Sequence, residues 1–316
     1  MNRIYVKMDG RLGNQFFQYA FARKLQSLVG GDLIFDFTSL KLNKKDGFDG
    51  ADGLENHLEK FNVKPYKYID SGNFDSSIIP SHQRRLFNIM RRIKPMTRRR
   101  WYVELVELID HRLLQALGIY FLESANPYKY LRYPSKPRDL FVRGWFEGSC
   151  YFKDIAAELR EELTPKLPIS DDLTGLYADL LSDEYICVTI RRGDFTSDTY
   201  SKRYLICTPE YYEKGVRIIK ERHPGAKVFA CSDDVDWCRR NLDFGSDTIF
   251  EPDGLPVWEK IRLMSACKHF VLSNSTFSWW CQFLSAYGEK CVVAPSVWRR
   301  DNPAPKEIFD EDWILI

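Results

Sequence analysis

The sequence contains no apolar run of the roughly 20 residues that a membrane-spanning helix requires. Its first residues, Met1 to Tyr5, enter a strand-like pattern at once and lack the apolar segment of a signal peptide. These two absences argue against an integral membrane protein and against a secreted one. We therefore expect a cytoplasmic location.

Cysteine and histidine are present, but not in the spacings that bind metals. None of the eight cysteines forms a CxxC pair, and the five histidines lie far apart in the sequence. This argues against the common zinc-binding motifs. We expect buried, reduced thiols rather than disulfides, because the cysteines fall within strand-like and helix-like stretches. They include Cys187, Cys231 and Cys291 in strand-like stretches, and Cys267 and Cys281 in helix-like ones.

Two common nucleotide-binding motifs are also missing. The sequence has neither GxGxxG nor GxxxxGK[ST], so it supports neither a dinucleotide-binding site nor a P-loop NTPase. The formal net charge is only +2, which argues against a nucleic-acid-binding protein whose whole surface is basic. With 44% hydrophobic and 28% charged residues in 316, the chain has the composition of a globular protein with room for two domains.

The sequence does contain a regular alternation of strand-like and helix-like stretches. A strand, a glycine-containing loop, a helix and a second strand form one βαβ unit in the first half, at 4–7, 9–15, 15–28 and 32–37. A further strand of the first half is predicted at 140–146. The second half predicts strands at 185–190, 227–231, 247–250, 269–272 and 291–294. Helices are predicted at 151–163, 209–222 and 256–267. Repeated units of this length predict parallel, doubly wound sheets. Pro165 and Pro168 interrupt the pattern, so we expect two domains, 1–164 and 165–316.

Polar segments follow three of the second-half strands, and we expect them to meet at one edge of the sheet. The segment Arg191-Arg192-Gly193-Asp194 carries two guanidinium groups that suit a phosphate; a structural Arg–Asp ion pair is the alternative. Asp233 or Asp234 could accept hydrogen bonds from a purine such as guanine, or could cap a helix.

The third segment, Ser273–Ser278, opens a predicted helix, and a helix N-terminus can bind an anion. Simple capping by Ser275 or Ser278 is the alternative. The spacing of Asp234 and Asp236 also resembles a DxD metal site, which we discount because Asp236 falls within the first turn of a predicted helix.

Basic residues gather in one place, with eight Lys or Arg in the stretch 84–100. An amphipathic helical pattern follows this stretch. Such a combination could attach the protein peripherally to an anionic membrane surface, and a solvated helix face is the alternative.

Four segments occur in an order that resembles the family 11 glycosyltransferases, the α-1,2-fucosyltransferases. They are GRLGNQFFQYA from Gly10, IRRGD from Ile190, CSDD from Cys231 and SNSTFSWW from Ser273. The likeness extends from residue 3 to 313 and is weak over about 40–135. It implies an α/β fold of the GT-B type, with two Rossmann-like domains facing a central cleft. It also implies GDP-L-fucose as donor, no metal, an acceptor-side N-terminal domain and a donor-binding C-terminal domain.

The resemblance also implies roles for single residues. Arg191 looks like the family's diphosphate-binding arginine, and the loop with Asn14 faces donor and acceptor. The expected catalytic residues are Asp194, Arg191 and Asn14. The expected donor-binding residues are Arg191, Arg192, Asp233, Asp234, Ser275, Thr276, Phe277, Ser278, Gly13 and Gln15. Thr189 stands where the family usually has His, so no imidazole is expected at this site.

Together these expectations describe transfer of L-fucose from GDP-β-L-fucose to the 2-hydroxyl of an acceptor sugar, a terminal β-galactoside of a glycan or lipid-linked precursor. Arg191 and the helix N-terminus would hold the leaving diphosphate without a metal, and Asp194 would take the hydroxyl proton. Two alternatives stay open: a different nucleotide sugar as donor, and a non-catalytic carbohydrate-binding protein.

Overall fold

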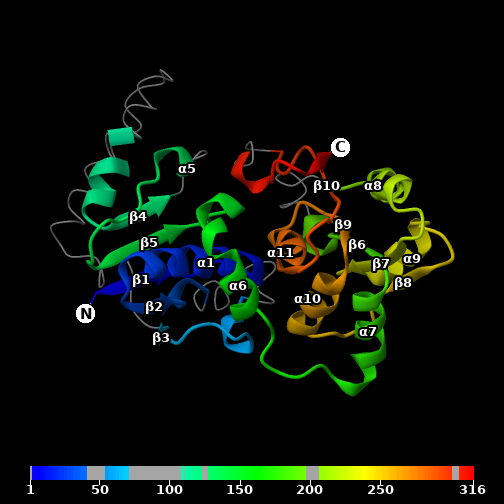
Figure 1. Ribbon diagram of the computed structural model, residues 1–316, viewed down its shortest axis with the longest axis horizontal. Helices are drawn as coiled ribbons and strands as arrows, with labels where there is room; N and C mark the ends of the chain where they lie inside the picture. Colours follow the sequence, from blue (N-terminus) through cyan, green and yellow to red (C-terminus); the bar gives the residue numbers. More distant parts are fainter. Residues whose placement is uncertain are drawn as a thin grey trace. The chain divides into compact units, whose positions relative to one another are not determined.

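The structure is a computed structural model that describes residues 2–40, 54–70, 108–109, 111–122, 127–196, 206–300 and 306–316 (Figure 1). The chain divides into two compact units. Unit 1 contains Met1–Leu58, Lys64–Ala156 and Pro305–Ile308. Unit 2 contains Glu59–Val63, Ala157–Ala304 and Phe309–Ile316. Each unit has a parallel sheet of its own, as the alternating pattern predicts.

The sheet of unit 1 has five strands in the order β3-β2-β1-β5-β4, and all their pairings are parallel. The strands are β1 (Arg3–Lys7), β2 (Asp32–Asp36), β3 (Tyr66–Ile69), β4 (Ile119–Leu122) and β5 (Leu140–Gly144). The sequence predicted β1, β2 and β5, whereas β3 and β4 were not predicted. Both of these lie at the edges of the sheet.

Helix α1 (Leu12–Val29) connects β1 to β2 and is buried along most of its length. It begins after Gly10, whose φ of +77° is a conformation that a side chain disfavours. It ends at Gly30, whose N–H donates to the carbonyl of Gln26. Aromatic residues fill the space beneath it, and Phe21 stacks on Phe146 with ring centroids 4.1 Å apart. The helix therefore forms one layer of the core of unit 1.

The sheet of unit 2 has six strands in the order β11-β10-β9-β6-β7-β8, and all pairings are again parallel. The strands are β6 (Tyr185–Ile190), β7 (Lys227–Ser232), β8 (Thr248–Phe250), β9 (His269–Val271), β10 (Val292–Ala294) and β11 (Ile314–Leu315). All six residues of β6 are buried, because this strand lies in the middle of the sheet. Five of these strands were predicted from the sequence.

The helices of unit 2 connect these strands. They are α7 (Thr174–Ser182), α8 (Pro209–Arg222), α9 (Val235–Asn241), α10 (Val257–Ala266) and α11 (Thr276–Leu284). Helix α8 begins as predicted, because Thr208 Oγ1 accepts from the N–H of Tyr211 and Pro209 occupies the first position. The short elements elsewhere are α5 (Pro127–Tyr130), η1 (Leu58–Lys60), η6 (Asp171–Leu173), η7 (Gly193–Thr196) and η8 (Lys306–Ile308).

One predicted helix is wrong in its extent. The stretch 151–163 was expected to be a single helix, but α6 covers only Ala156–Glu162. Two 3-10 turns precede it, η4 (Ser149–Tyr151) and η5 (Lys153–Ile155). Phe152 lies between them with φ −151° and ψ 13°, which is not helical, and its side chain is completely buried. The helix is interrupted at Phe152, because burying this ring stabilises the protein more than continuing the helix would.

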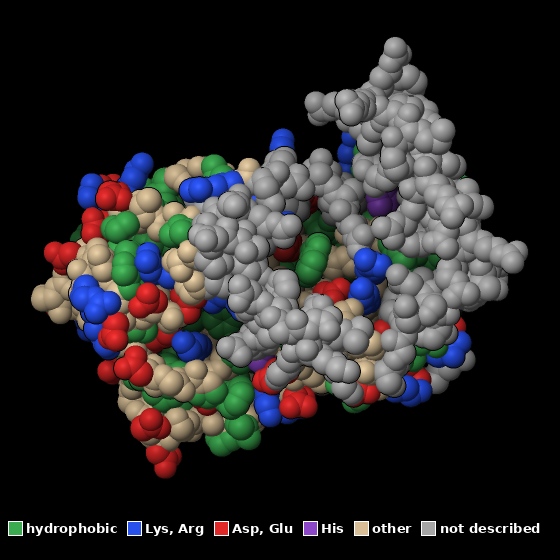
Figure 2. Space-filling view, turned by 180° about the vertical axis from the view of Figure 1, so that it is seen from behind, with side chains coloured by type: hydrophobic (Ala, Val, Ile, Leu, Met, Phe, Trp, Pro, Cys, Tyr) green, Lys and Arg blue, Asp and Glu red, His purple; other side chains and the backbone are tan. Residues whose placement is uncertain are grey.

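The cysteines are free thiols, as predicted; seven are buried and Cys150 is half-buried. On the face drawn in Figure 2, acidic and basic side chains are interspersed over the described surface. None of the helices that the structure describes is both long enough and apolar enough to cross a bilayer. The basic stretch 84–100 lies outside the described residues, so membrane docking stays a prediction.

Candidate functional site

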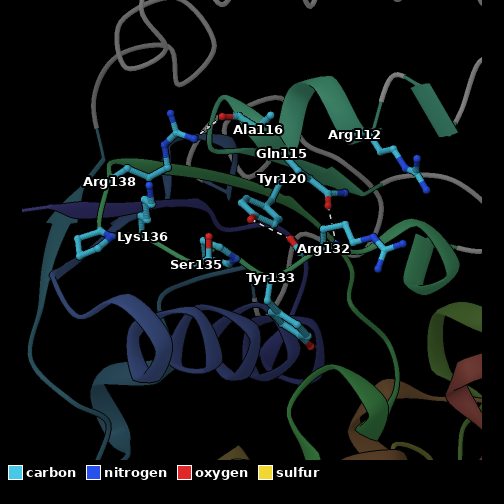
Figure 3. A pocket seen from close by; sticks show the side chains of 11 residues that line it. Arg112, Gln115, Ala116, Tyr120, Arg132, Tyr133, Ser135, Lys136 and Arg138 are labelled. Carbon is cyan, nitrogen blue, oxygen red and sulfur yellow. Dashed lines mark hydrogen bonds between the residues drawn. The ribbon is translucent and has the colours of Figure 1, made fainter.

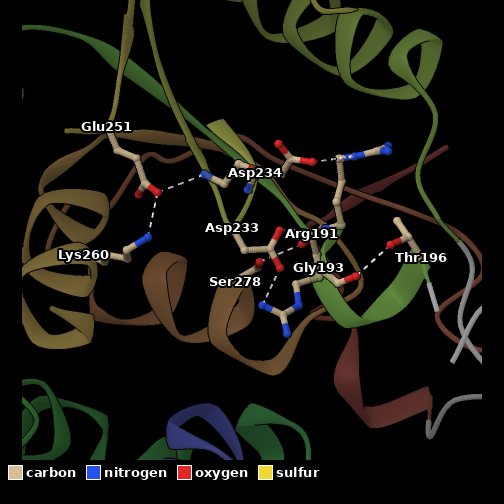
Figure 4. Close-up of polar contacts among 11 residues, drawn as sticks. Arg191, Gly193, Thr196, Asp233, Asp234, Glu251, Lys260 and Ser278 are labelled. Carbon is tan, nitrogen blue, oxygen red and sulfur yellow. Dashed lines mark hydrogen bonds and ion pairs between the residues drawn. The ribbon is translucent and has the colours of Figure 1, made fainter. Parts of the chain in front are cut away.

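The carboxyl ends of β6, β7 and β9 bring together the predicted polar segments of unit 2 (Figure 4). Arg191 follows β6 and Asp233 follows β7, and their side chains form an ion pair with Nη1 2.7 Å from Oδ2. Each of these two side chains is about a quarter exposed, so both are accessible from solvent. The sheet edge therefore presents a paired guanidinium and carboxylate where α/β sheets generally bind ligands.

Asp233 also shapes the backbone after β6. Its Oδ1 accepts a 2.8 Å hydrogen bond from the N–H of Arg192. A Cβ at Gly193 would lie 2.4 Å from Asp233 Oδ2, so a larger residue here would force this carboxylate to move. Glycine lets the carboxylate pack directly against the turn. Asp233 holds the turn that presents Arg191.

Arg192 lies over the indole of Trp237, with its guanidinium carbon 3.5 Å from the ring centroid. Its Nε is 3.7 Å from Asp234 Oδ2. Asp234 Oδ1 in turn accepts from the N–H of Trp237 at 3.1 Å and caps α9. The capping alternative is thus what the structure shows for Asp234. Asp236 is in the first turn of α9 and is largely exposed, with Arg239 Nη1 3.6 Å from its carboxylate.

Hydrogen bonds of buried hydroxyl groups hold the start of α11 in place. Thr189 Oγ1 accepts a 2.9 Å hydrogen bond from the N–H of Ser273, and Ser273 Oγ lies 2.9 Å from Ser278 Oγ. Ser275 occupies the N-cap position but makes no capping bond through its side chain. Neither Ser275 nor Ser278 therefore caps the helix as the simple alternative supposed. The first turn, with Thr276 and Phe277, faces the same sheet edge as Arg191 because β9 neighbours β6.

Helix α11 itself is fixed by apolar packing. Trp279 and Trp280 are completely buried, and Trp279 stacks on Phe283 with ring centroids 5.3 Å apart. The segment that leads into α11 is held as well, because the hydroxyl of Tyr211 in α8 donates to the carbonyl of Leu272 at 2.6 Å. Packing and hydrogen bonds together hold the N-terminus of α11 in one position.

Asp194 lies in η7, directly after the two arginines. The placement of its side chain lies outside what the structure describes. Its expected role as a base therefore stays a prediction.

The expected residues of the first half all lie in the first turn of α1, in unit 1. Gln15 is completely buried, and its Nε2 donates to the carbonyls of Gly10 and Glu55 at 3.1 and 2.7 Å. Its Oε1 accepts from the N–H of His57 at 3.1 Å. All of these bonds stay within unit 1, so Gln15 ties the loop around residue 55 to the start of α1.

Gly13 and Asn14 complete this turn. Gly13 is buried, whereas Asn14 is partly exposed. The buried Oδ1 of Asn14 has no hydrogen-bond partner among the described residues. A buried acceptor without a partner suits a ligand that can donate a hydrogen bond, such as a sugar hydroxyl.

Sequence reasoning did not single out Asp9, which lies in the same loop after β1. Burial raises the pKa of the Asp9 carboxyl, and Lys7, 3.6 Å away, opposes this shift. A carboxyl with a raised pKa at the end of a parallel strand has the properties of a general base. The signal in the sequence was its position at the start of the glycine-containing loop of the βαβ unit, not its residue type.

One described set of side chains could share a metal ion: Glu184, His223 and His269, whose ligand atoms all lie within 4.8 Å of one another. Their sequence spacing gave no sign of this. Glu184 precedes β6 and His269 opens β9, so they lie at the amino-terminal edge of the sheet, opposite Arg191.

Hydrogen bonds already occupy this cluster. His269 Nδ1 accepts from the N–H of Cys291 at 3.0 Å, which leaves the ring proton on Nε2, 3.1 Å from Glu184 Oε1. His223 Nδ1 is 2.9 Å from the same oxygen. A metal would have to displace the proton on His269, so this arrangement fits a hydrogen-bonded carboxylate better than a metal site.

Comparison with known proteins identifies the family of the chain. The sequence matches glycosyl transferase family 11 over residues 114–316. It is similar to an alpha-1,2-colitosyltransferase of Escherichia coli, 27% identical over 326 residues, covering 100% of this chain and 99% of that protein. It is also similar to the O-antigen biosynthesis glycosyltransferase WbnK of Escherichia coli, 28% identical over 334 residues, covering 98% of this chain and 99% of that protein.

Among solved structures, the fucosyltransferase NodZ from Bradyrhizobium has a TM-score of 0.50 at 13% identity, covering 90% of this chain and 92% of that one. The fold of two parallel α/β units is accordingly of the GT-B type, as the sequence predicted. Because the family match spans well over half of its length, the chain belongs to glycosyl transferase family 11.

Proposed function

We propose that this protein transfers L-fucose from GDP-β-L-fucose to the 2-hydroxyl of an acceptor sugar, a terminal β-galactoside of a glycan or lipid-linked precursor. The observation that carries the proposal is the meeting of Arg191, Arg192 and the N-terminus of α11 at one sheet edge, in a chain of family 11. This edge offers two guanidinium groups and free helix N–H groups to a diphosphate.

The proposed leaving group gains negative charge as the bond to the sugar breaks. Arg191 would exchange part of its contact with Asp233 for a diphosphate oxygen, and the N-terminus of α11 would take another. Because buried hydroxyls and tryptophans already fix α11, the N–H groups at its N-terminus need no rearrangement when the charge develops. Such preorganised donors stabilise a transition state without a metal, and we propose a metal-independent reaction.

The acceptor oxygen would attack the anomeric carbon from the face opposite GDP, which inverts the configuration and gives an α-linked product. Its proton must go to a base. Asp194 is the proposed base, since it follows the diphosphate-binding turn directly, and Asp9 is a second carboxyl with suitable properties. Asn14, whose Oδ1 has no partner within the described part of the chain, would accept a hydrogen bond from a sugar hydroxyl.

The proposal is tested by incubating the protein with GDP-fucose and an aryl β-galactoside and measuring GDP release and the product linkage. We expect GDP release that depends on the galactoside and an α-1,2 linkage in the product by NMR. A protein that binds the galactoside but releases no nucleoside diphosphate from any nucleotide sugar would instead be a carbohydrate-binding protein.

A second donor deserves the same assay because the alpha-1,2-colitosyltransferase is similar over the full chain. Colitose lacks the 3-hydroxyl of fucose, so the two donors differ by one hydrogen-bonding group. Faster turnover with GDP-colitose than with GDP-fucose would assign the protein to colitose transfer. A site that hydrogen-bonds the 3-hydroxyl should discriminate strongly against the donor that lacks it.

A further inference from the structure

Unit 1 contains a pocket of about 540 Å³, and none of its lining residues is among those that we propose for donor binding or catalysis. Residues from the stretches 112–120 and 132–138 line it (Figure 3). Its volume is within the range of small-molecule sites, roughly 300–1,000 Å³. The pocket is therefore large enough for more than one ordered water or ion.

The lining is strongly basic. Four cationic side chains line the pocket, Arg112, Arg132, Lys136 and Arg138, and no carboxylate is among its lining residues. In Figure 3, Arg112 and Arg132 lie at one end and Lys136 and Arg138 at the other. All four residues are exposed, and within the described part of the chain none of them forms a salt bridge. Like charges gathered in one cavity repel one another, and a bound polyanion would relieve this repulsion.

Neutral groups hold the frame of the pocket in place. Gln115 is buried, and its Oε1 accepts from the N–H of Arg132 at 2.6 Å while its Nε2 donates to the carbonyl of Tyr130 at 3.2 Å. The hydroxyl of Tyr120 donates to the carbonyl of Arg132 at 3.0 Å. Arg138 donates to the carbonyl of Ala116. These bonds fix the backbone that carries the cations.

Among the described residues, no acidic side chain lines the pocket to balance these cations. Burial raises the pKa of Tyr120 to about 12, so its hydroxyl stays neutral at physiological pH. The adjacent acid, Asp139, is already paired with Arg3, with Oδ2 2.5 Å from Nη2. A bound anion would supply the balancing charge.

We propose that this pocket binds a phosphorylated ligand through the phosphate or diphosphate group of an ester. Guanidinium groups match phosphate oxygens two at a time, and a doubly or triply charged group matches several cations better than a single carboxylate does. The ester can be a soluble phosphate compound or a lipid headgroup, since both present the same oxygens. Binding here does not depend on the identity of the sugar donor.

The experiment measures binding of inorganic pyrophosphate to the full chain by calorimetry. The double variant Arg132→Gln/Arg138→Gln should weaken binding by about tenfold or more, as expected for the loss of charge-assisted hydrogen bonds. The variant Lys214→Gln/Arg217→Gln removes the same charge from the exposed face of α8 and should bind as the unchanged protein does. Lys136→Gln serves if the double variant melts early, and it should weaken binding by a smaller factor.

Pyrophosphate could instead occupy the site at Arg191, so Arg191→Gln is measured in parallel. Loss of binding in Arg191→Gln together with normal binding in Arg132→Gln/Arg138→Gln would overturn the proposal. No detectable binding of pyrophosphate or phosphatidate to the unchanged protein would overturn it too, as would equal weakening in the α8 control.

A second arm identifies the source of the phosphate. The protein is sedimented with phosphatidylcholine vesicles that contain or lack phosphatidate. Sedimentation that requires both phosphatidate and the pocket arginines assigns a lipid headgroup. Pyrophosphate binding without such sedimentation assigns a soluble phosphate ester. Both results support the phosphate chemistry of the pocket.

Discussion

The guanidinium of Arg191 and the carboxylate of Asp233 are paired at 2.7 Å across two neighbouring strands, although 42 positions separate them in the sequence. The same carboxylate receives the N–H of Arg192. Asp233 therefore orients the arginine that we propose for the diphosphate, and its oxygens are engaged before any ligand binds. A contact between Asp233 and guanine would use the remaining lone pairs of these oxygens or replace one of these bonds.

Replacement of Arg191 by lysine should lower fucosyl transfer by about 10²-fold or more, as does the loss of one donor to a developing anion. A lysine retains the charge but cannot bond two diphosphate oxygens or keep the same geometry toward Asp233. The measurement is kcat for GDP release, with thermal melting as a control for folding. Near-normal turnover in this variant would remove Arg191 from the proposed mechanism.

Replacement of Thr189 by valine should displace the start of α11. The hydroxyl of Thr189 accepts from the N–H of Ser273, and valine would leave that buried donor unpaired at a cost of about 1–3 kcal/mol. We expect a lower melting temperature and a higher KM for the donor. Thr189→Ser keeps the hydroxyl and should lie close to the unchanged protein on both measurements; equal defects in the two variants would contradict this role.

Replacement of Asp194 by asparagine should lower kcat by about 10²-fold or more, the usual contribution of a general base. Asp9→Asn is the comparison and should keep most of the activity. The reverse result would identify Asp9 as the base. Because burial raises the pKa of Asp9, the rising limb of kcat/KM against pH would then lie above the ordinary range of a carboxyl.

Transfer should continue in EDTA, because the proposed diphosphate contacts are Arg191, Arg192 and the N-terminus of α11. GDP release is measured after dialysis against EDTA, with and without added Mg²⁺ or Mn²⁺. Complete loss of activity that either ion restores would contradict the proposal. It would indicate a metal site at Asp234 and Asp236 instead.

The stability of unit 2 should fall as the pH is lowered through the range that histidine titrates. Burial lowers the pKa of His269 in the folded protein, so the unfolded chain binds a proton that the folded chain does not. Stability is therefore lost as the pH falls from the unfolded pKa, about 6.5, toward the lower folded value. The hydrogen bond from His269 also lowers the pKa of Glu184, which acts in the same direction at more acidic pH.

The variant His269→Asn tests this dependence. Its amide oxygen can still accept from the N–H of Cys291, but it does not titrate. Melting temperatures between about pH 7.5 and 5.5 should fall less steeply in this variant than in the unchanged protein. Identical slopes in the two proteins would contradict the role of His269.

Much of the sheet of unit 2 could be predicted because its signals are local. Strand β6 is a continuous run of β-branched, aromatic and small residues, and α8 has Thr208 and Pro209 at its start; both elements have the predicted bounds. The meeting of three polar segments at one edge also followed, since parallel strands end on the same side. Strands β3 and β4 escaped prediction because they are four-residue edge strands within weakly patterned sequence.

The pairings within the site could not be predicted in the same way. The engagement of Asp233 with Arg191 depends on how two side chains pack after their strands have been placed. The approach of His223 and His269 to Glu184 is equally a product of tertiary structure. Family resemblance supplied residue identities for the site, but it did not supply these contacts.

The division of the chain between the units has a consequence for building chimeras with relatives. Unit 1 includes Pro305–Ile308, and the backbone of Gly148 approaches Glu307 so closely that a Cβ at 148 would lie 2.2 Å from its carbonyl oxygen. Unit 2 likewise includes Glu59–Val63. A recombinant that exchanges unit 2 at a single crossover would separate both short segments from their native neighbours. Grafts should therefore use five crossovers, at the five boundaries between segments of the two units, so that each inserted segment keeps its parental partner.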